Sequence, residues 1–197
     1  MPGDIYAVCG TGPVSTIIKW FTYSVYSHVG VLCPLSGPQV SEIGGSPHQI
    51  AKFTNSGLWL YESTALRKRK CDFAGKIVKG VQVHDPVEIV RHRYPEVHHL
   101  YRLRNPMTSW GVTEMMEYLS ARLGDRYDYA GAVGTVLPLI RLFFGDAPDR
   151  LFCSEMAAKA LFAAGVWPDK PQPRTPGGIL RFGVEEGIYE FQGEVLV

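Results

Sequence analysis

Cys153 is the residue of this sequence whose type and setting best suit covalent chemistry. It stands in LFCSEMAAKAL, residues 151–161, directly before an alanine-rich run that predicts a helix from Ser154. A free thiol has a pKa of ~8.5 and attacks only as its thiolate, so it needs help near neutral pH. The unpaired N–H groups and partial positive charge of a helix N-terminus give such help. Two interpretations follow: a nucleophile, or a buried core thiol.

A nucleophilic thiol also needs a base to take its proton, and histidine suits this role. The chain has six histidines. His28, in YSHVGVL, begins a short apolar strand, a setting in which structural histidines are also common. His98 and His99 are adjacent, so on a strand they point to opposite faces. None of the histidines shows the H-x-x-x-H spacing of a helical zinc pair, so a metal-dependent hydrolase is the last of the alternatives.

A third polar group usually fixes the tautomer of such a base. Glu62 lies in LWLYEST, where its aromatic and aliphatic neighbours predict a buried strand. A buried carboxylate needs a partner, because an unpaired buried charge is costly. Glu62 is therefore the candidate for orienting His28, and an exposed glutamate on an edge strand is the alternative.

The elements that must position these residues come as strands first and helices later. Strands are predicted in residues 3–8, 27–35, 58–64, 76–90, 97–103 and, as an edge strand, 187–197. Helices are predicted in residues 14–24, 108–124 and 154–166, the second capped by Thr108 or Ser109. The region 35–57 reads as an extended loop. This order favours an α+β fold over a doubly wound parallel sheet.

Composition limits the class of protein. The 197 residues suit one domain over 1–197, and a net charge of +1 gives no electrostatic reason to expect nucleic acid. The widely spaced cysteines predict free thiols rather than a zinc site or a disulfide framework: Cys9, Cys33, Cys71 and Cys153. We expect neither a secretory signal nor a transmembrane helix, and hence a cytoplasmic or phage-associated protein. The apolar stretch 130–144 has two interpretations, a buried or cleft-covering helix and a surface that contacts a membrane.

Several motifs, taken in order, resemble a known family. They are GDIYAV, YSHVGVL, LYEST, RYDYAG, LFCSEMAAKAL and TPGGIL, which extend from Gly3 to about Phe182. The chain is similar to the permuted NlpC/P60 papain-like hydrolases, in the YiiX-like branch related to the lecithin retinol acyltransferase group. In that branch the histidine strand precedes the cysteine helix, which reverses the papain order. This sequence has the reversed order.

The resemblance implies a circularly permuted papain-like fold, with a small antiparallel sheet or barrel packed against helices and the cysteine at a helix N-terminus. It implies that Cys153 is the nucleophile, His28 the general base and Glu62 the group that orients His28. It implies cleavage or transfer at an acyl bond through an acyl-thioester, with no metal or cofactor. Ser27 and Tyr127 are the implied substrate-binding residues; Tyr127 lines the cleft, donates to the oxyanion, or is a core tyrosine.

Four functions remain after the sequence is read. A cysteine amidase acting on a peptide or peptidoglycan stem comes first, and a lipid acyltransferase or acyl hydrolase second. A catalytically silent binding domain is third, because all three candidate catalytic residues are present, and a metal enzyme is last. The long apolar segment 130–149 and the region 35–57 are expected to shape the cleft. The sequence does not predict an oligomeric state.

Overall fold

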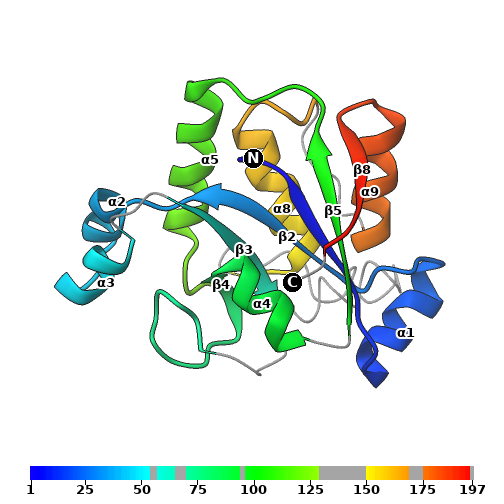
Figure 1. The fold of residues 1–197 in the computed structure, drawn as a ribbon, viewed down its shortest axis with the longest axis horizontal. Coiled ribbons are helices and arrows are strands. Elements are labelled where there is room, and N and C mark those ends of the chain that lie inside the picture. Colours follow the sequence, from blue (N-terminus) through cyan, green and yellow to red (C-terminus); the bar gives the residue numbers. More distant parts are fainter. Residues whose placement is uncertain (54–56, 65–69, 94–95, 129–149, 169–174, 196–197) are drawn as a thin grey trace.

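A computed structural model describes residues 1–53, 57–64, 70–93, 96–128, 150–168 and 175–195 (Figure 1). The predicted cleft-shaping segment 130–149, with its stretch 130–144, lies outside the described residues. Within the described part of the chain, no helix combines the length and the apolar character that crossing a bilayer requires.

At the centre of the described part of the chain is an eight-stranded sheet with the order β7-β6-β4-β3-β2-β1-β5-β8. Its neighbours are antiparallel except for the parallel pair β6–β7. The strands are β1 (Ile5–Cys9), β2 (His28–Pro34), β3 (Leu58–Thr64), β4 (Gly80–His84), β5 (Val97–Leu103), β6 (Arg126–Tyr127), β7 (Arg150–Leu151) and β8 (Tyr189–Glu194). The sheet is open in the described residues, and β8 is at its edge as the sequence predicted.

Helices cover both faces of this sheet. They are α1 (Pro13–Thr22), α2 (Gly37–Glu42), α3 (Pro47–Lys52), α4 (Pro86–Arg93), α5 (Ser109–Ala121), α8 (Cys153–Ala163) and α9 (Pro176–Glu185). The main core joins the sheet to α5, α8 and α9, and a smaller apolar cluster under α4 includes Leu60 and Ile89. In Figure 1, α4 lies in front of the sheet and α8 behind it. The α+β class is therefore confirmed.

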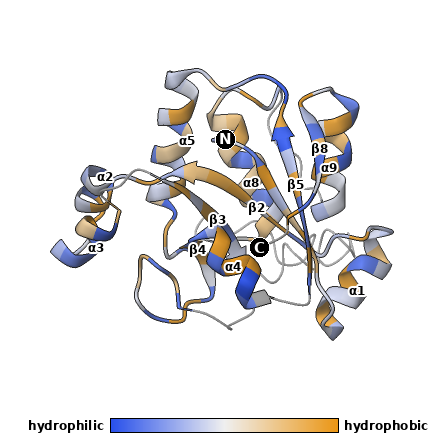
Figure 2. Cartoon of the chain, viewed as in Figure 1, coloured by the Kyte–Doolittle hydropathy of each residue, from blue (hydrophilic) through white to orange (hydrophobic). Residues whose placement is uncertain are grey.

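The strands follow from side chains that alternate between two buried environments. Val29, Val31 and Cys33 of β2 belong to the main core, whereas Leu32 belongs to the smaller cluster under α4. Because successive side chains on a strand point to opposite faces, such a strand is apolar throughout. The hydrophobic colouring of β2 shows this pattern (Figure 2).

The prediction of an extended loop over 35–57 is wrong, because this region contains α2 and α3. Each helix starts with a Ser-x-x-Gln capping box, Ser36 with Gln39 and Ser46 with Gln49. In α3, for example, the Ser46 N–H donates to Gln49 Oε1 at 2.6 Å. The capping box was the signal for a helix start, but the glycines and prolines around it suggested a loop.

Two further helices were not predicted. In α4, Asp85 Oδ1 accepts hydrogen bonds from the N–H groups of Val87 and Glu88, at 2.8 and 3.2 Å. In α9, the Thr175 hydroxyl accepts one from Gly178 N–H at 3.1 Å. Both helices thus begin at a capping side chain followed by proline, a strong start signal in a short segment. The predicted Thr108 cap of α5 is confirmed, because its hydroxyl accepts from Gly111 N–H at 3.1 Å.

The pairing between β2 and β3 covers only part of each strand. The β2–β3 ladder begins at Val31 and Tyr61, whereas His28 pairs with β1 and Glu62 pairs with β4. Helix α8 contacts both β2 and β3. Helix α8 therefore packs where β2 and β3 lie side by side.

Candidate active site

Cys153 is the first residue of α8, and its side chain is buried. The His28 ring and the backbone N–H groups of Val29 and Ser154 stabilise its thiolate form. Burial alone raises the pKa of the Cys153 thiol. The positive His28 ring, its hydrogen bond and the two N–H groups outweigh burial and lower the pKa below its ordinary value.

His28, at the start of β2, lies between Cys153 and Glu62. Its Nε2 atom is 2.7 Å from Glu62 Oε2, and its ring interacts with the charge of the Cys153 sulfur. Burial lowers the pKa of His28, but the negative charges of Cys153 and Glu62 outweigh burial and raise it to about 9. The two shifts together favour a thiolate–imidazolium pair at neutral pH.

Glu62 belongs to β3, and its side chain is 1% exposed. Gly30 lies on β2, two residues after His28, and lets β3 approach closely. A Cβ atom at Gly30 would lie 2.7 Å from Leu60 Cδ1, 2.8 Å from the Tyr61 carbonyl oxygen and 3.4 Å from Glu62 Cβ. Because the contact with Tyr61 is with backbone, a larger residue at Gly30 would force β3 away from β2. Glycine at this position thus helps to bring Glu62 to His28.

The structure therefore brings the three predicted catalytic residues together. Cys153, His28 and Glu62 come from α8, β2 and β3, and they form one continuous line of polar contacts. A thiolate held by an imidazolium, which is held in turn by a carboxylate, is an arrangement suited to nucleophilic attack. Glu155, in the first turn of α8, forms an ion pair with Lys159 at 2.7 Å and suits the helix dipole.

Ser27 immediately precedes His28 but turns its hydroxyl to the backbone. Its Oγ accepts a hydrogen bond from Gly10 N–H at 3.1 Å and donates to the Val8 carbonyl oxygen at 3.4 Å. These contacts anchor the start of β2 against the end of β1. The predicted substrate-binding role of Ser27 stays a prediction.

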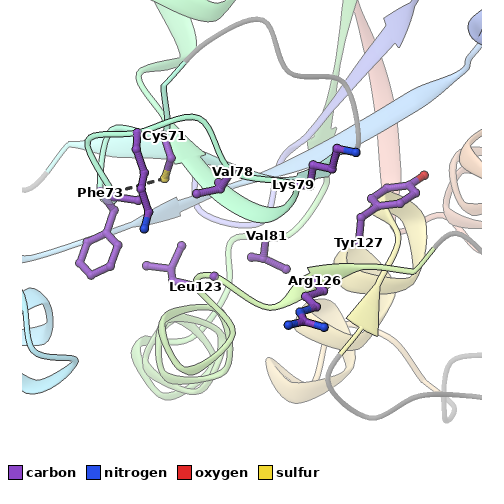
Figure 3. A pocket seen from close by; sticks show the side chains of 11 residues that line it. Cys71, Phe73, Val78, Lys79, Val81, Leu123, Arg126 and Tyr127 are labelled. Carbon is purple, nitrogen blue, oxygen red and sulfur yellow. Dashed lines mark hydrogen bonds between the residues drawn. The ribbon is translucent and has the colours of Figure 1, made fainter.

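Tyr127, in β6, lines a cavity of about 640 Å³ (Figure 3). The cavity combines apolar and basic side chains, among them Phe73, Val78, Val81, Lys76, Lys79 and Arg126. The three candidate catalytic residues do not line it. However, Tyr127 pairs with Leu151 of β7, two residues before Cys153, so the cavity and the cysteine are joined through a short stretch of backbone.

No family model matches the chain, and no curated protein matches it either. Among solved structures, the fold is similar to that of metalloprotein yiiX from Escherichia coli O157:H7, DUF1105. The TM-score is 0.59 at 15% sequence identity, and the alignment covers 100% of this chain and 98% of that chain. At this identity the likeness shows a shared fold.

The yiiX protein is described as a metalloprotein, which raises the question of whether this chain has metal ligands. A protein metal site generally needs three or more ligands that converge on one point. Among the described residues, no group of three His, Cys, Asp or Glu side chains is arranged to hold a metal ion. The described residues therefore do not fit such a site.

Sequence reasoning missed His84, Asp72 and the Val29 amide. His84 Nε2 lies 3.7 Å from Glu62 Oε1, on the side away from His28. The alternation of Val81, Gln82 and Val83 along β4 was a signal for His84, because it puts Gln82 and His84 on one face. It gave no register with β3, so the contact with Glu62 could not be foreseen. His98 and His99 do point to opposite faces as predicted, toward Tyr6 and Tyr26.

Proposed function

We propose that this protein is a cysteine-dependent hydrolase that cleaves an amide bond of the peptide or peptidoglycan type. The observation that supports the proposal most is the line of contacts from the Cys153 sulfur through His28 to Glu62 at the N-terminus of α8. The lowered pKa of the thiol agrees with a nucleophile and not with an inert core cysteine, whose pKa burial raises. The fold shared with yiiX and the histidine-first order support a circularly permuted papain-like domain over residues 1–197.

The proposed reaction has two halves. The Cys153 thiolate attacks the carbonyl carbon, a C–S bond forms, and the Cys153 backbone N–H at the helix start stabilises the oxyanion. The C–N bond then breaks as the His28 imidazolium gives its proton to the leaving amine, and an acyl-thioester remains. His28, now neutral, takes a proton from water; the water oxygen attacks the thioester, and the thiolate leaves. Glu62 keeps the His28 ring oriented throughout.

The basic cavity lined by Tyr127 supports a substrate that carries carboxylates. Among the residues that the structure describes, its lining has three basic residues, Lys76, Lys79 and Arg126, and no acidic residue. Peptide and peptidoglycan stems end in carboxylates, which such a cavity attracts. We propose that Tyr127 contributes to substrate binding from this side.

A second candidate is acyl transfer or hydrolysis on a lipid. Helix α1 leads directly to the His28 strand and exposes several large apolar side chains: Val14, Ile17, Trp20 and Phe21. Such a face, with tryptophan and phenylalanine, suits a lipid surface. This candidate predicts binding to lipid vesicles and no action on muropeptides, whereas the amidase predicts the reverse.

The proposal is tested by mapping iodoacetamide labelling of each cysteine across pH with mass spectrometry. We expect Cys153 to label fastest below the ordinary thiol pKa, because its lowered pKa leaves more of it as thiolate there than in the other cysteines. Its labelling rate should rise as pH rises through the lowered pKa and then level off. Labelling at Cys9 should rise only above the ordinary thiol pKa, because burial and Glu194 raise the pKa of Cys9.

The other cysteines serve as internal controls. Cys9 is more exposed than Cys153, so accessibility and thiolate chemistry predict opposite orders of labelling. Cys33 is fully buried, and burial raises its pKa. Faster labelling of Cys9 than Cys153 at every pH would contradict the proposal and favour a silent binding domain.

Glu62→Gln should lower kcat/KM by roughly 10- to 100-fold, because the amide still contacts His28 but no longer carries a charge. Loss of the carboxylate removes one cause of the raised His28 pKa, so the alkaline limb of the pH–rate profile should move to lower pH. Steady-state kinetics between pH 5 and about 10 measures both effects. Glu88→Gln, on the surface of α4, is the matched control and should leave the profile unchanged.

A further inference from the structure

His84 is buried next to the proposed catalytic site. The β3–β4 register pairs Glu62 with Gln82 and Leu60 with His84. Directly paired residues of an antiparallel ladder share a face, and so do residues two apart on one strand. Glu62 and His84 are therefore diagonal neighbours on the same face, and both side chains are 1% exposed.

Each ring nitrogen of His84 faces a different carboxylate. Nε2 lies 3.7 Å from Glu62 Oε1, and Nδ1 lies 3.6 Å from Asp72 Oδ2. Both separations are longer than a hydrogen bond, and Nδ1 has no hydrogen-bond partner within the described part of the chain, so each contact is electrostatic. Glu62 is buried and Asp72 is half-buried, so a polar ring between the two carboxylates offsets part of the cost of burying them.

Asp72 has two further polar contacts besides the one with His84. Its Oδ1 atom is 2.5 Å from Lys52 Nζ, and its Oδ2 atom accepts a hydrogen bond from Asp85 N–H at 3.0 Å. Burial raises the pKa of Asp72, but the contacts with His84, Lys52 and Asp85 outweigh it and lower the pKa. A charged Asp72 thus stands behind His84, anchored to α3 and to the start of α4.

We propose that His84 is a positioning residue for the catalytic base. Backed by Asp72, it holds one oxygen of Glu62 so that the other stays on Nε2 of His28. The inference rests on the proposed function, and it extends the line of contacts from Cys153 to Lys52 at the surface of α3. His84 does not reach the substrate; it acts on the reaction by fixing the direction and charge of Glu62.

The test measures the pH dependence of Cys153 alkylation by iodoacetamide, which needs no substrate. His84→Phe keeps a ring and removes both nitrogens. We expect the labelling rate of Cys153 near neutral pH to fall about tenfold, because a loosened Glu62 stabilises the His28 imidazolium less and the apparent thiol pKa rises. His84→Gln, which still offers a donor to Glu62, should recover part of this loss. Asp72→Asn should have an effect between those of the two variants.

Thermal unfolding of each variant separates positioning from core packing. His92→Phe on α4 is the control. It makes the same exchange of histidine for phenylalanine on the same side of the sheet, but at an exposed position. If His84→Phe does not fold, His84→Gln and Asp72→Asn decide the question. Variants that melt at lower temperature but keep the wild-type labelling profile overturn the proposal.

The two proposals fail in different ways. If wild-type Cys153 has no enhanced reactivity, the proposed function itself fails. If wild-type Cys153 is reactive and the folded His84 and Asp72 variants match it, the proposed function stands and the positioning role is wrong.

Discussion

Cys153→Ala is expected to lower turnover of an amide substrate by at least about 10,000-fold, because the reaction then has no nucleophile. Cys153→Ser should be similarly inactive, since its hydroxyl stays protonated where the thiol ionises. The fold should persist in both, because one small side-chain atom is removed or replaced. Turnover assays with far-UV circular dichroism and thermal unfolding measure the two expectations together.

Cys33 offers a matched control for this experiment. It lies on β2, close in sequence to His28, and it is fully buried like a core thiol. Cys33→Ala removes the same atom from the main core and should keep turnover near that of the wild type. Equal activity of the wild type and Cys153→Ala on a confirmed substrate would rule out the mechanism.

His28→Ala should be nearly as damaging, about 10,000-fold in kcat/KM, because one residue serves as base, acid and thiolate partner. Without the imidazolium, the apparent pKa of Cys153 should rise, and its labelling near neutral pH should slow. In the wild type, activity should fall as pH rises through about 9, where His28 loses the proton that the leaving amine needs. Alkylation and pH–rate profiles of the two proteins measure these effects.

A double variant tests whether the two residues act as a unit. If they do, Cys153→Ala with His28→Ala should cost about as much as either change alone. His92→Ala, at an exposed position of α4, is the control and should leave activity unchanged. An unchanged Cys153 labelling profile in His28→Ala would show that the imidazole does not activate the thiol.

The cysteine helix and the longer strands of the described sheet were predictable from local sequence because their signals are local, whereas the two-residue strands β6 and β7 were not predicted. Valines mark β2 and β4, and the alanine-rich run after Cys153 predicts α8. Helices α2 and α3 were missed although Ser36 and Ser46 each begin a capping box, because glycine and proline around them are equally typical of loops. The helix starts at Asp85 and Thr175 carried similar signals in segments too short for a clear apolar period.

The candidate site was predictable in residue type but not in geometry. The position of Cys153 directly before a predicted helix indicates a nucleophile. The resemblance to the permuted NlpC/P60 family indicated His28 and Glu62 as its partners. The contact between those two depends on how β3 lies beside β2, which no short stretch of sequence encodes. The Val29 amide and His84 depend on the same register and on where α8 enters, so they became visible only in three dimensions.

The candidate nucleophile, Cys153, lies far along the chain from His28 and Glu62, and this separation affects the folding rate. His28 and Glu62 are 34 residues apart, and α8 follows Glu62 by about half the chain. The last strand then pairs with β5, and the Tyr189 hydroxyl donates to the Gly3 carbonyl oxygen across 186 residues. Such a topology has a high contact order and folds slowly, because distant segments must meet before their contacts repay the lost chain entropy. During synthesis, the base and its carboxylate are therefore made well before the thiol, and the reactive thiolate is among the last properties that the folding protein acquires.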